Sequence, residues 1–535
     1  MGPSAHLDTF VRDHLPPVDQ QPVFSFDLPE LQYPPRLNAS TLLDRAIDAG
    51  FADKAAVLSE ARRYTYAQLL DAACRIAEVL VEDLGLVPGN RVLLHAPNTA
   101  LAIAAWFGVL RAGGVVVATM PMLRAGELQV VIDKAQISHA LFDPALTEAV
   151  SGAQSAAPVL RRPLPFDELE RRMAEKPGRF PPCPTAADDT ALIAFTSGTT
   201  GKPKGCIHFH RDVLAMADTF ARHLLKPEPE DVFCGTPPFA FTFGLGAAVV
   251  FPAAFGAATA LCSRPGYDEL LACIARHGVT TLFTAPTAYR ALLKDGSAEQ
   301  LRSLKTCVSA GEALPAATSD AWFERTGIRI VDGIGSTEMI HIFISAAGDE
   351  VRPGATGKPV PGYTAALLDD HNHLIEGPGQ GRLAIRGPTG CRYLADERQR
   401  NYVIDGWNVT GDIYRRDEDG YYWFVSRADD MIVSSGYNIG APEVEQAILT
   451  HPAVLETAVV GAADEQRGQL VKAFIVLHDP DTASDALRCE IQDHVKRTIA
   501  PYKYPRALEF VRELPKTQTG KIQRFRLRDS EAPAP

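Results

Sequence analysis

The sequence lacks the features that assign a chain to several common classes of protein. It contains nine cysteines but no Cys-x-x-Cys pair, so we expect reduced thiols in a cytoplasmic protein rather than a disulfide framework or a zinc site. It has no stripe of Lys and Arg, and its net charge is −12, which argues against nucleic acid as a partner. The N-terminus also lacks the charged and then apolar stretch of a signal peptide.

A long uninterrupted apolar run is missing as well. The nearest candidate runs from Phe243 to Cys262, but Pro252 and three glycines interrupt it, and no Lys or Arg marks its N-terminal side. A membrane span is therefore not expected, and a buried helix and strand of the core is the better interpretation.

The composition is that of a globular protein large enough for more than one domain. The chain has 535 residues, of which 46% are hydrophobic and 22% are charged. Its first part alternates between helical and extended apolar patterns, which favours βαβ units around parallel sheets. The segments that carry this alternation are Ala67–Val81 and Thr99–Arg111 as helices, with Arg91–His95, Val115–Thr119, Ala191–Phe195, Thr280–Phe283, Lys305–Ser309 and Ile328–Asp332 as strands. A Pro-rich stretch, Pro177 to Pro184, is expected to be a surface connection between two subdomains.

The pattern changes after about Gly357. Short strands with turn residues follow, and Asp419-Gly420 predicts a two-residue hairpin. From about Asp430 a compact α/β segment begins, with Pro442 at a helix start. The predicted fold class is α/β: a large N-terminal domain, residues 1–428, of doubly wound sheets with a small β-rich subdomain, and then a small α/β C-terminal domain, residues 429–535.

A Gly-rich run with many hydroxyls, Thr196 to Gly205, follows the strand Ala191–Phe195. Its glycines allow close approach of a ligand, and its hydroxyls, two lysines and free N–H groups suit phosphate oxygens. It is not a Walker loop, because only two residues separate Gly198 from Gly201 and Pro203 prevents immediate helix entry. A flexible surface turn is the alternative, which the lysines and the preceding strand disfavour.

Four further motifs follow, and each of them alone is also typical of an ordinary turn. The Ser-Ala-Gly-Glu and Asp-Gly-Ile-Gly-Ser-Thr-Glu motifs each follow a predicted strand, and the carboxylate of the second suits a hard cation such as Mg²⁺. The Thr-Gly-Asp motif offers a carboxylate to paired hydroxyls, and the last motif carries a lysine in a Thr-Gly loop. These motifs occupy residues 309–312, 332–338, 410–412 and 515–524.

In this order the five motifs resemble those of the acyl-adenylate-forming enzymes, the superfamily of acyl- and aryl-CoA ligases, luciferases and peptide-synthetase adenylation domains. The resemblance implies ATP, Mg²⁺ and coenzyme A as cofactors, with Glu338 as the Mg²⁺ ligand and Lys521 and Thr337 as its catalytic partners. The residues implied to bind ATP are Thr196, Ser197, Gly198, Thr199, Thr200, Lys204, Gly311, Glu312, Asp332, Gly333, Asp412 and Arg427.

The same resemblance implies a two-step reaction. A carboxylate attacks the α-phosphate of ATP to give an acyl-AMP, and Lys521 neutralises the charge between them. The small domain then rotates about Asp429 and admits a thiol, which displaces AMP. Gly436 and Tyr437 are implied to contact CoA, although Val433 stands where many CoA ligases have Lys.

An aromatic stretch from Pro238 to Gly246 indicates the acid, although a plain core segment is the alternative. This stretch resembles the acid pocket of benzoate-type ligases, as does the segment after Gly335, and Ile334 in place of an aromatic residue is also benzoate-like. A hydroxyl where benzoate enzymes often have Ala suggests a polar ring substituent, and 2-aminobenzoate is the leading expectation. The residues expected to contact the acid are Phe241, Thr242, Phe243, Gly335, His341 and Ile342.

Two alternatives to this assignment remain at the level of sequence. A stand-alone adenylation enzyme that loads a carrier protein would use the same chemistry, and an inactive binding protein would keep only the fold. The presence of Glu338, Asp412 and Lys521 argues against the second. His208 and His210 alternate on one predicted strand but lack a third ligand at helical spacing, so zinc is not expected there. If the chain associates, a homodimer is the expected assembly.

Overall fold

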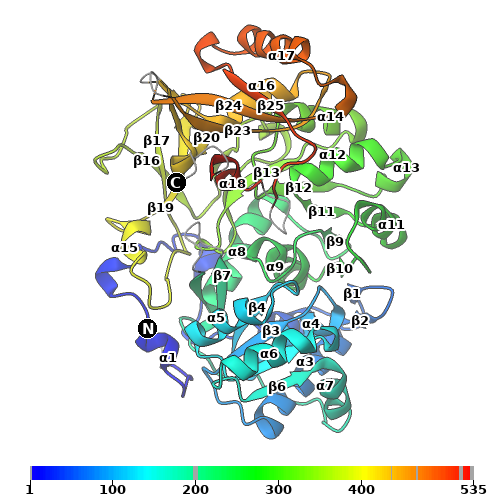
Figure 1. Cartoon of the computed structure of the whole chain (residues 1–535). Helices are drawn as coiled ribbons and strands as arrows, with labels where there is room; N and C mark the ends of the chain where they lie inside the picture. Colours follow the sequence, from blue (N-terminus) through cyan, green and yellow to red (C-terminus); the bar gives the residue numbers. More distant parts are fainter. Residues whose placement is uncertain (1–2, 197–202, 435–436, 465–467, 517–521, 530–535) are drawn as a thin grey trace.

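The computed structural model describes residues 3–196, 203–434, 437–464, 468–516 and 522–529. Within these ranges the strands form four sheets, and the chain runs from the first sheet at the bottom of Figure 1 to the fourth at its top. The sheets are numbered in the order in which most of their strands occur along the chain.

The first sheet has the order β6-β5-β3-β4-β7-β8, and its strands are parallel except for the pair β7/β8. Alternate residues of β3 face opposite apolar clusters, since Val92 and Leu94 contact one cluster and Leu93 the other. Helices cover both faces, as expected for a doubly wound sheet. The strands are β3 Arg91–His95, β4 Val115–Thr119, β5 His139–Phe142, β6 Arg162–Pro165, β7 Thr190–Thr196 and β8 Lys204–Phe209.

The second sheet has the order β15-β14-β13-β12-β11-β9-β10-β1-β2, with a parallel centre from β13 to β1 and antiparallel edges. Its central strands β11 and β12 are buried along nearly their whole length because both faces are covered. The strands are β1 Ala55–Leu58, β2 Arg63–Thr65, β9 Val232–Gly235, β10 Ala258–Ala260, β11 Thr281–Thr284, β12 Thr306–Ala310, β13 Val331–Gly335, β14 Ile342–Ser345 and β15 Lys358–Pro359.

The third sheet is antiparallel and forms the β-rich part of the chain, and the fourth belongs to the C-terminal part. The third contains β16 Thr364–Leu368, β17 Gly379–Arg386, β18 Val403–Ile404, β19 Trp407–Arg416 and β20 Tyr422–Arg427. The fourth contains β21 Ile432–Ser434, β22 Tyr437–Ile439, β23 Val454–Asp464, β24 Gly468–Leu477 and β25 Ala507–Phe510. No strand is shared between the two sheets among the described residues.

Local sequence explains where several helices begin. Thr65 and Gln68 form a capping box at the start of α3, and the hydroxyls of Thr99 and Ser484 cap α4 and α17. The helices are α1 Phe10–Asp13, α2 Thr41–Asp48, α3 Tyr66–Glu78, α4 Ala100–Arg111, α5 Ala125–Ala135, α6 Thr147–Ala156, α7 Phe166–Met173, α8 His210–Met216, α9 Thr242–Leu245, α10 Phe251–Phe255, α11 Tyr267–His277, α12 Pro286–Asp295, α13 Ala298–Leu301, α14 Ala316–Thr326, α15 Gln399–Tyr402, α16 Ala441–Leu449, α17 Asp485–Thr498 and α18 Arg524–Asp529.

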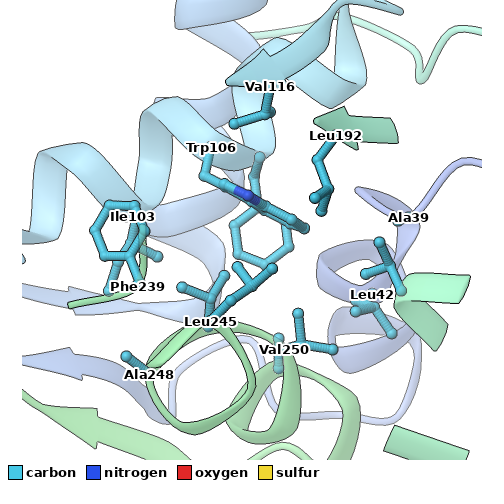
Figure 2. Packing of buried hydrophobic residues seen from close by; sticks show 14 of the residues in the cluster. Ala39, Leu42, Ile103, Trp106, Val116, Leu192, Phe239, Leu245, Ala248 and Val250 are labelled. Atoms are coloured by element: carbon cyan, nitrogen blue, oxygen red, sulfur yellow. The ribbon is translucent and has the colours of Figure 1, made fainter. Parts of the chain in front are cut away.

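The main core lies between the first and second sheets. Helix α4 is buried on every side, which explains why its sequence is apolar all round. Figure 2 shows its Trp106 at the centre of this packing, between Leu192 of β7 and Leu245 of α9. Trp106 is 1% exposed, so the indole fixes the distance between the two sheets.

Most predicted elements of the large domain are confirmed, and the core interpretation of Phe243–Cys262 is confirmed by α9, α10 and β10. The interpretation of Pro177–Pro184 is wrong in one respect. The stretch is partly exposed, but the strands before and after it, β6 and β7, belong to the same sheet. It therefore connects two strands of one subdomain, which a local excess of proline could not reveal.

The hairpin at Asp419-Gly420 is confirmed, but its loop is longer than predicted. The Asp417 N–H donates to the Tyr421 carbonyl, so three residues form the loop, with Gly420 at φ 81°. A type I turn followed by a left-handed glycine gives this arrangement, and a two-residue turn would need positive φ at both positions. Among the described residues, no helix has both the length and the hydropathy to cross a bilayer.

Candidate active site

The Gly-rich run joins β7 to β8 along the chain, and these two strands pair antiparallel. Thr196 and Lys204 are directly opposite each other across this pair. Ser197, Gly198, Thr199 and Thr200 lie outside the described residues, whereas the flanking Thr196 is described. The hydroxyl of Thr196 is buried and has no hydrogen-bond partner within the described ranges, so it remains available to a ligand.

The turn after β13 carries Thr337 and Glu338 and is strained. Ile340 is fully buried and has φ 65°, a conformation that is rare for a β-branched residue. The Thr389 hydroxyl donates to the Met339 carbonyl at 2.8 Å and holds the turn from outside. Strain of this kind costs about 1–3 kcal/mol and persists where the surroundings impose it, commonly at functional sites.

Glu338 is joined to the Gly-rich hairpin through a tyrosine. The Tyr393 hydroxyl donates to Glu338 Oε1 at 2.6 Å and accepts from Lys204 Nζ at 2.7 Å. Lys204 Nζ also lies 3.6 Å from Glu338 Oε1, and Glu338 is 8% exposed. Burial raises the pKa of Tyr393, so its hydroxyl stays protonated and remains a donor. A cation, a hydroxyl and a carboxylate are thus fixed at one point.

A second buried network supports the backbone of the same turn. His208 Nε2 donates to the Thr337 carbonyl at 2.7 Å, and His208 Nδ1 lies 3.7 Å from Asp212. Asp212 pairs with Arg392 at 2.8 Å, and both side chains are fully buried. Burial alone would raise the pKa of Asp212, but the charge of Arg392 lowers it to about 2. The carboxylate is therefore ionised, and it orients the imidazole that holds Thr337.

His208 and His210 do not share a ligand. His210 follows β8 and starts α8, and its Nδ1 accepts from the Ala39 N–H at 3.0 Å. The two histidines thus have separate structural partners.

Asp412 and Arg427 face each other across β19 and β20. Arg427 Nη1 donates to Asp412 Oδ1 at 3.0 Å, and the Asp412 N–H donates to the Thr410 hydroxyl at 3.2 Å. Gly411 between them has φ 77°, which other residues rarely adopt. The Thr-Gly-Asp motif lies inside β19, which begins at Trp407. The two side chains therefore place one carboxylate and one guanidinium next to each other.

The ATP-binding residues predicted in the second and third motifs lie at the carboxyl ends of adjacent parallel strands. Ala310 of β12 pairs with Gly333 of β13, and Gly311 follows with φ 94°. Burial raises the pKa of Asp332 to about 7, and its Oδ1 has no partner among the described residues. The carboxyl ends of parallel strands are where open α/β sheets bind ligands. Glu312 follows this edge directly.

The acid-side residues surround His341. Its ring lies 4.7 Å from Phe251, 5.3 Å from Phe220 and 5.8 Å from Phe243, measured between ring centroids. His341 is 2% exposed, and neither of its ring nitrogens has a hydrogen-bond partner among the described residues. Burial lowers the pKa of His341 to about 3, so the imidazole is neutral at physiological pH.

Not every predicted acid-side residue contacts this group of rings. Thr242 is buried at the start of α9, and with Phe241 it lines a small cavity against β7. Ile342 begins β14, where its side chain lies against Gly333. A Cβ at Gly335 would lie 2.7 Å from the His341 carbonyl, so this glycine is required by the backbone.

The start of α18 is held within the C-terminal part, where Arg524 Nη2 donates to Glu445 Oε1 at 2.8 Å. Burial alone would lower the pKa of Arg524, but the charge of Glu445 raises it. Lys521 and Gly436 lie outside the described residues. Asp429 falls in the turn after β20, and Tyr437 begins β22.

Three residues at this site were missed by sequence reasoning. Tyr393 and His208 connect segments far apart in the chain, and Gly246 admits the His341 ring, since a Cβ there would lie 2.6 Å from His341 Nε2. Gly246 stands four residues after Thr242, one helical turn on the same face, and this spacing was the one available signal.

Comparisons with known proteins agree with this arrangement. Residues 44–393 match the AMP-binding enzyme family, and residues 443–521 match the AMP-binding enzyme C-terminal domain. The chain is 36% identical to the benzoate–CoA ligase of Thauera aromatica over 94% of this chain and 98% of that protein. It is 34% identical to a 4-hydroxybenzoate–CoA/benzoate–CoA ligase of Rhodopseudomonas palustris over 92% and 93% of the two chains.

Solved structures give the same result. The anthranilate CoA ligase AuaEII in complex with anthranoyl-AMP superposes with a TM-score of 0.90 at 34% identity, covering 94% of this chain and 99% of that one. A benzoate CoA ligase from Burkholderia xenovorans superposes with a TM-score of 0.82 at 32% identity, over 92% and 99% of the two chains.

Proposed function

This chain belongs to the AMP-binding enzyme family of acid–thiol ligases, and from that premise we propose that it converts an aromatic acid of the 2-aminobenzoate type to its CoA thioester. The acid is first joined to AMP, with release of pyrophosphate, and then transferred to the CoA thiol. The relatives that act on benzoate and the neighbour bound to anthranoyl-AMP support an aryl acid.

One observation carries the choice of acid. His341 is buried among phenylalanines with both ring nitrogens unpaired within the described part of the chain. A neutral imidazole offers one donor and one acceptor, and a buried polar group without a partner costs about 1–3 kcal/mol. An ortho-amino group on an aromatic ring would supply a donor to this acceptor, whereas benzoate would leave it unpaired. Thr242, at the start of α9, lines a separate small cavity against β7, and its hydroxyl is the second polar group that we assign to the acid.

The residues on the nucleotide side act by positioning charge. Lys204, with its hydrogen bond to Tyr393, presents an ammonium to the departing pyrophosphate, and the unpaired hydroxyl of Thr196 can donate to a phosphate oxygen. Asp412 can accept from ribose hydroxyls beside Arg427. His208 fixes the backbone of Thr337, so the hydroxyl of that residue is oriented before ATP binds.

The carboxylate of Glu338 fits a role in holding Mg²⁺. Mg²⁺ is commonly bound through one or two carboxylates together with substrate phosphates, and Glu338 is a nearly buried carboxylate beside a predicted phosphate loop. When bound, the ion would neutralise phosphate charge. Tyr393 would keep one oxygen of Glu338 oriented while the other remains free for the ion.

The second step is assigned to movement of the C-terminal domain, residues 429–535, about Asp429. Lys521 would neutralise the charge between acid and α-phosphate in the first step, and Gly436 and Tyr437 would contact CoA in the second. Lys521→Ala should slow adenylation by about 10²–10³-fold, as removal of a preorganised charge does. The same variant should still transfer a supplied acyl-AMP to CoA, and unchanged adenylation would refute this role.

Transfer to a carrier-protein phosphopantetheine is the second candidate, because Val433 replaces a lysine common in CoA ligases. The two candidates differ only in the thiol. Consumption of free CoA with formation of aryl-CoA supports the first, and release of pyrophosphate without CoA consumption supports the second.

The decisive experiment is a pyrophosphate-release assay over substituted benzoates, with and without CoA. We expect kcat/KM for 2-aminobenzoate to exceed that for benzoate by about tenfold, the effect of one satisfied buried hydrogen bond. Equal or better turnover of benzoate would overturn the choice of acid while leaving the ligase reaction standing. No release with any aromatic acid would overturn the aryl assignment itself.

A further inference from the structure

Three cysteines that are distant in sequence meet on the far side of the second sheet. Cys234 lies in β9, Cys262 follows β10, and Cys273 lies in α11. Cys234 Sγ lies 3.8 Å from Cys273 Sγ and 4.0 Å from Cys262 Sγ, and all three sulfurs lie within 4.8 Å of one another. Their spacings of 28 and 11 residues match no familiar metal motif, so the sequence pattern gave no sign of this cluster.

The sulfur positions have the dimensions of a metal site. Sulfurs bound at about 2.3 Å to one ion lie about 3.8 Å apart around a tetrahedral centre and about 4.0 Å apart around a trigonal one. Two of the three separations, 3.8 and 4.0 Å, fall in this range, and the third, between Cys262 and Cys273, is within 4.8 Å. A disulfide needs sulfurs about 2.05 Å apart, so a disulfide would require movement of the backbone or side chains, whereas an ion requires almost none.

Burial and charge around the three thiols also suit a cation. Cys234 and Cys273 are buried in an apolar cluster, and Cys262 is half-buried next to the exposed residues 263–268, which provide an entry path. The Glu269 carboxylate is 6% exposed, and its negative charge acts on both Cys262 and Cys273.

The cluster is separate from the acid pocket. Side chains alternate across a strand, so Cys234 and its neighbour Phe233 face opposite sides of the sheet. Phe233 packs on Phe283 at 6.1 Å in the core that also contains His341's aromatic neighbours, while Cys234 packs with α11 on the other face. Substitutions in the cluster should therefore leave the chemistry in place.

We propose that Cys234, Cys262 and Cys273 form a binding site for a thiophilic d¹⁰ metal ion, Zn²⁺ or Cu⁺. Soft thiolate ligands select these ions over Mg²⁺ or Ca²⁺. The ion joins β9 and α11 to the chain after β10. Thiolate ligands are formed by loss of protons, so binding releases protons to solvent. Its role is structural, and it is independent of which acid the enzyme activates.

The test uses the full chain, reduced and desalted without oxygen, and titrated with Cd²⁺ as a spectroscopic probe. We expect thiolate-to-cadmium charge-transfer absorption that saturates at one equivalent and protection of the half-buried Cys262 thiol from alkylation. Cys262→Ser should abolish this saturation. Removing an outer hydrogen-bond partner lowers metal affinity about 10–100-fold, and removing a ligand should lower it more. Cys307→Ser, in the same apolar cluster but outside the group, is the matched control and should bind normally.

Parallel arms with Zn²⁺ and with Cu⁺ under chelator competition identify the ion that is held more tightly. Each bound ion should raise Tm of the wild type and leave Tm of Cys262→Ser unchanged. Retained pyrophosphate release in Cys262→Ser shows that this variant folds. If Cys262→Ser does not fold, the test is instead whether bound metal protects Cys262 from alkylation in the wild type. Absence of saturable absorption in the reduced wild type, or an equal signal in folded Cys262→Ser, would overturn the proposal. So would a disulfide between any two of these cysteines in freshly purified enzyme.

Discussion

The nucleotide side and the acid side of the candidate site differ in how their polar groups are satisfied. On the nucleotide side, Lys204, Tyr393 and Glu338 bond to one another, and Asp412 bonds to Arg427. On the acid side, His341 is buried among phenylalanine rings and has no polar partner among the described residues. The charged groups of Lys204, Glu338 and Asp412 are paired by the protein itself, although the Thr196 hydroxyl and Asp332 Oδ1 on that side lack partners among the described residues. The acid side leaves the pairing of His341 to a ligand.

This difference separates what is common to a reaction from what selects a substrate. Groups that stabilise charge act best when they are fixed before the reaction, because reorganisation then costs little. A buried group left unpaired penalises every acid that cannot complete its hydrogen bond. Substitutions on the nucleotide side should therefore slow all acids equally, and substitutions on the acid side should change their ranking.

The largest expected effect is on the nucleotide side, at Glu338. Glu338→Gln should lower kcat for adenylation by about 10²–10³-fold with every acid, since it removes a preorganised charge. Pyrophosphate release over a range of Mg²⁺ concentrations measures this loss. Glu418→Gln, in the exposed hairpin loop, is the control. A loss confined to 2-aminobenzoate would contradict the division between the two sides.

The next effect concerns Tyr393, which holds Glu338 and Lys204. Tyr393→Phe should lower kcat about 10–100-fold, because a hydrogen bond to a charged group contributes about 1.5–3 kcal/mol. Tyr402→Phe is a matched control, because the Tyr402 hydroxyl bonds to the neutral Ser336 hydroxyl at 3.3 Å. As a positioning residue, Tyr393 should also shift the Mg²⁺ dependence of kcat. An unchanged Mg²⁺ dependence with a general loss of stability would show a merely structural role.

His341 is expected to lower the free energy of unfolding as pH falls. Burial lowers its pKa to about 3, and the unfolded value is about 6.5, so below pH 6.5 the unfolded state binds the proton and the native state does not. Stability from this group is complete above pH 6.5 and is lost by about 1.4 kcal/mol per pH unit below it. Denaturant unfolding at pH 7 and 5 should show a smaller decrease for His341→Leu than for the wild type. His371→Gln, which alters an exposed histidine, should leave the decrease unchanged.

The smallest effect should appear at Thr242 and only in the ranking of acids. Thr242→Ala should reduce the preference for 2-aminobenzoate over benzoate by about 3–10-fold, the contribution of one hydrogen bond at 0.5–1.5 kcal/mol. Competition between the two acids in one assay measures the ratio directly. Equal slowing with both acids would place Thr242 in packing rather than in selection.

Much of the fold could be predicted because its signals are local. The strands Arg91–His95 and Val115–Thr119 begin and end at the predicted residues, since the apolar runs that predict them are local. The connection Pro177–Pro184 was misplaced because proline marks exposure and not the sheet to which the next strand belongs. The predicted hairpin loop was too short, because Asp-Gly also fits a three-residue loop with a left-handed glycine.

The sequence by itself determined the fold class, the family and the motifs of the nucleotide side, because each of these is written in consecutive residues. Tertiary structure alone decided which groups meet: Tyr393 with Glu338 across 55 residues, His208 with Thr337 across 129, and three cysteines on separate elements. The physical reason is that such contacts depend on how the sheets stack and on which face of a strand each side chain lies. The distances between these side chains and the burial of each decide which groups form hydrogen bonds and how their pKa values shift. No local sequence pattern specifies those distances or that burial.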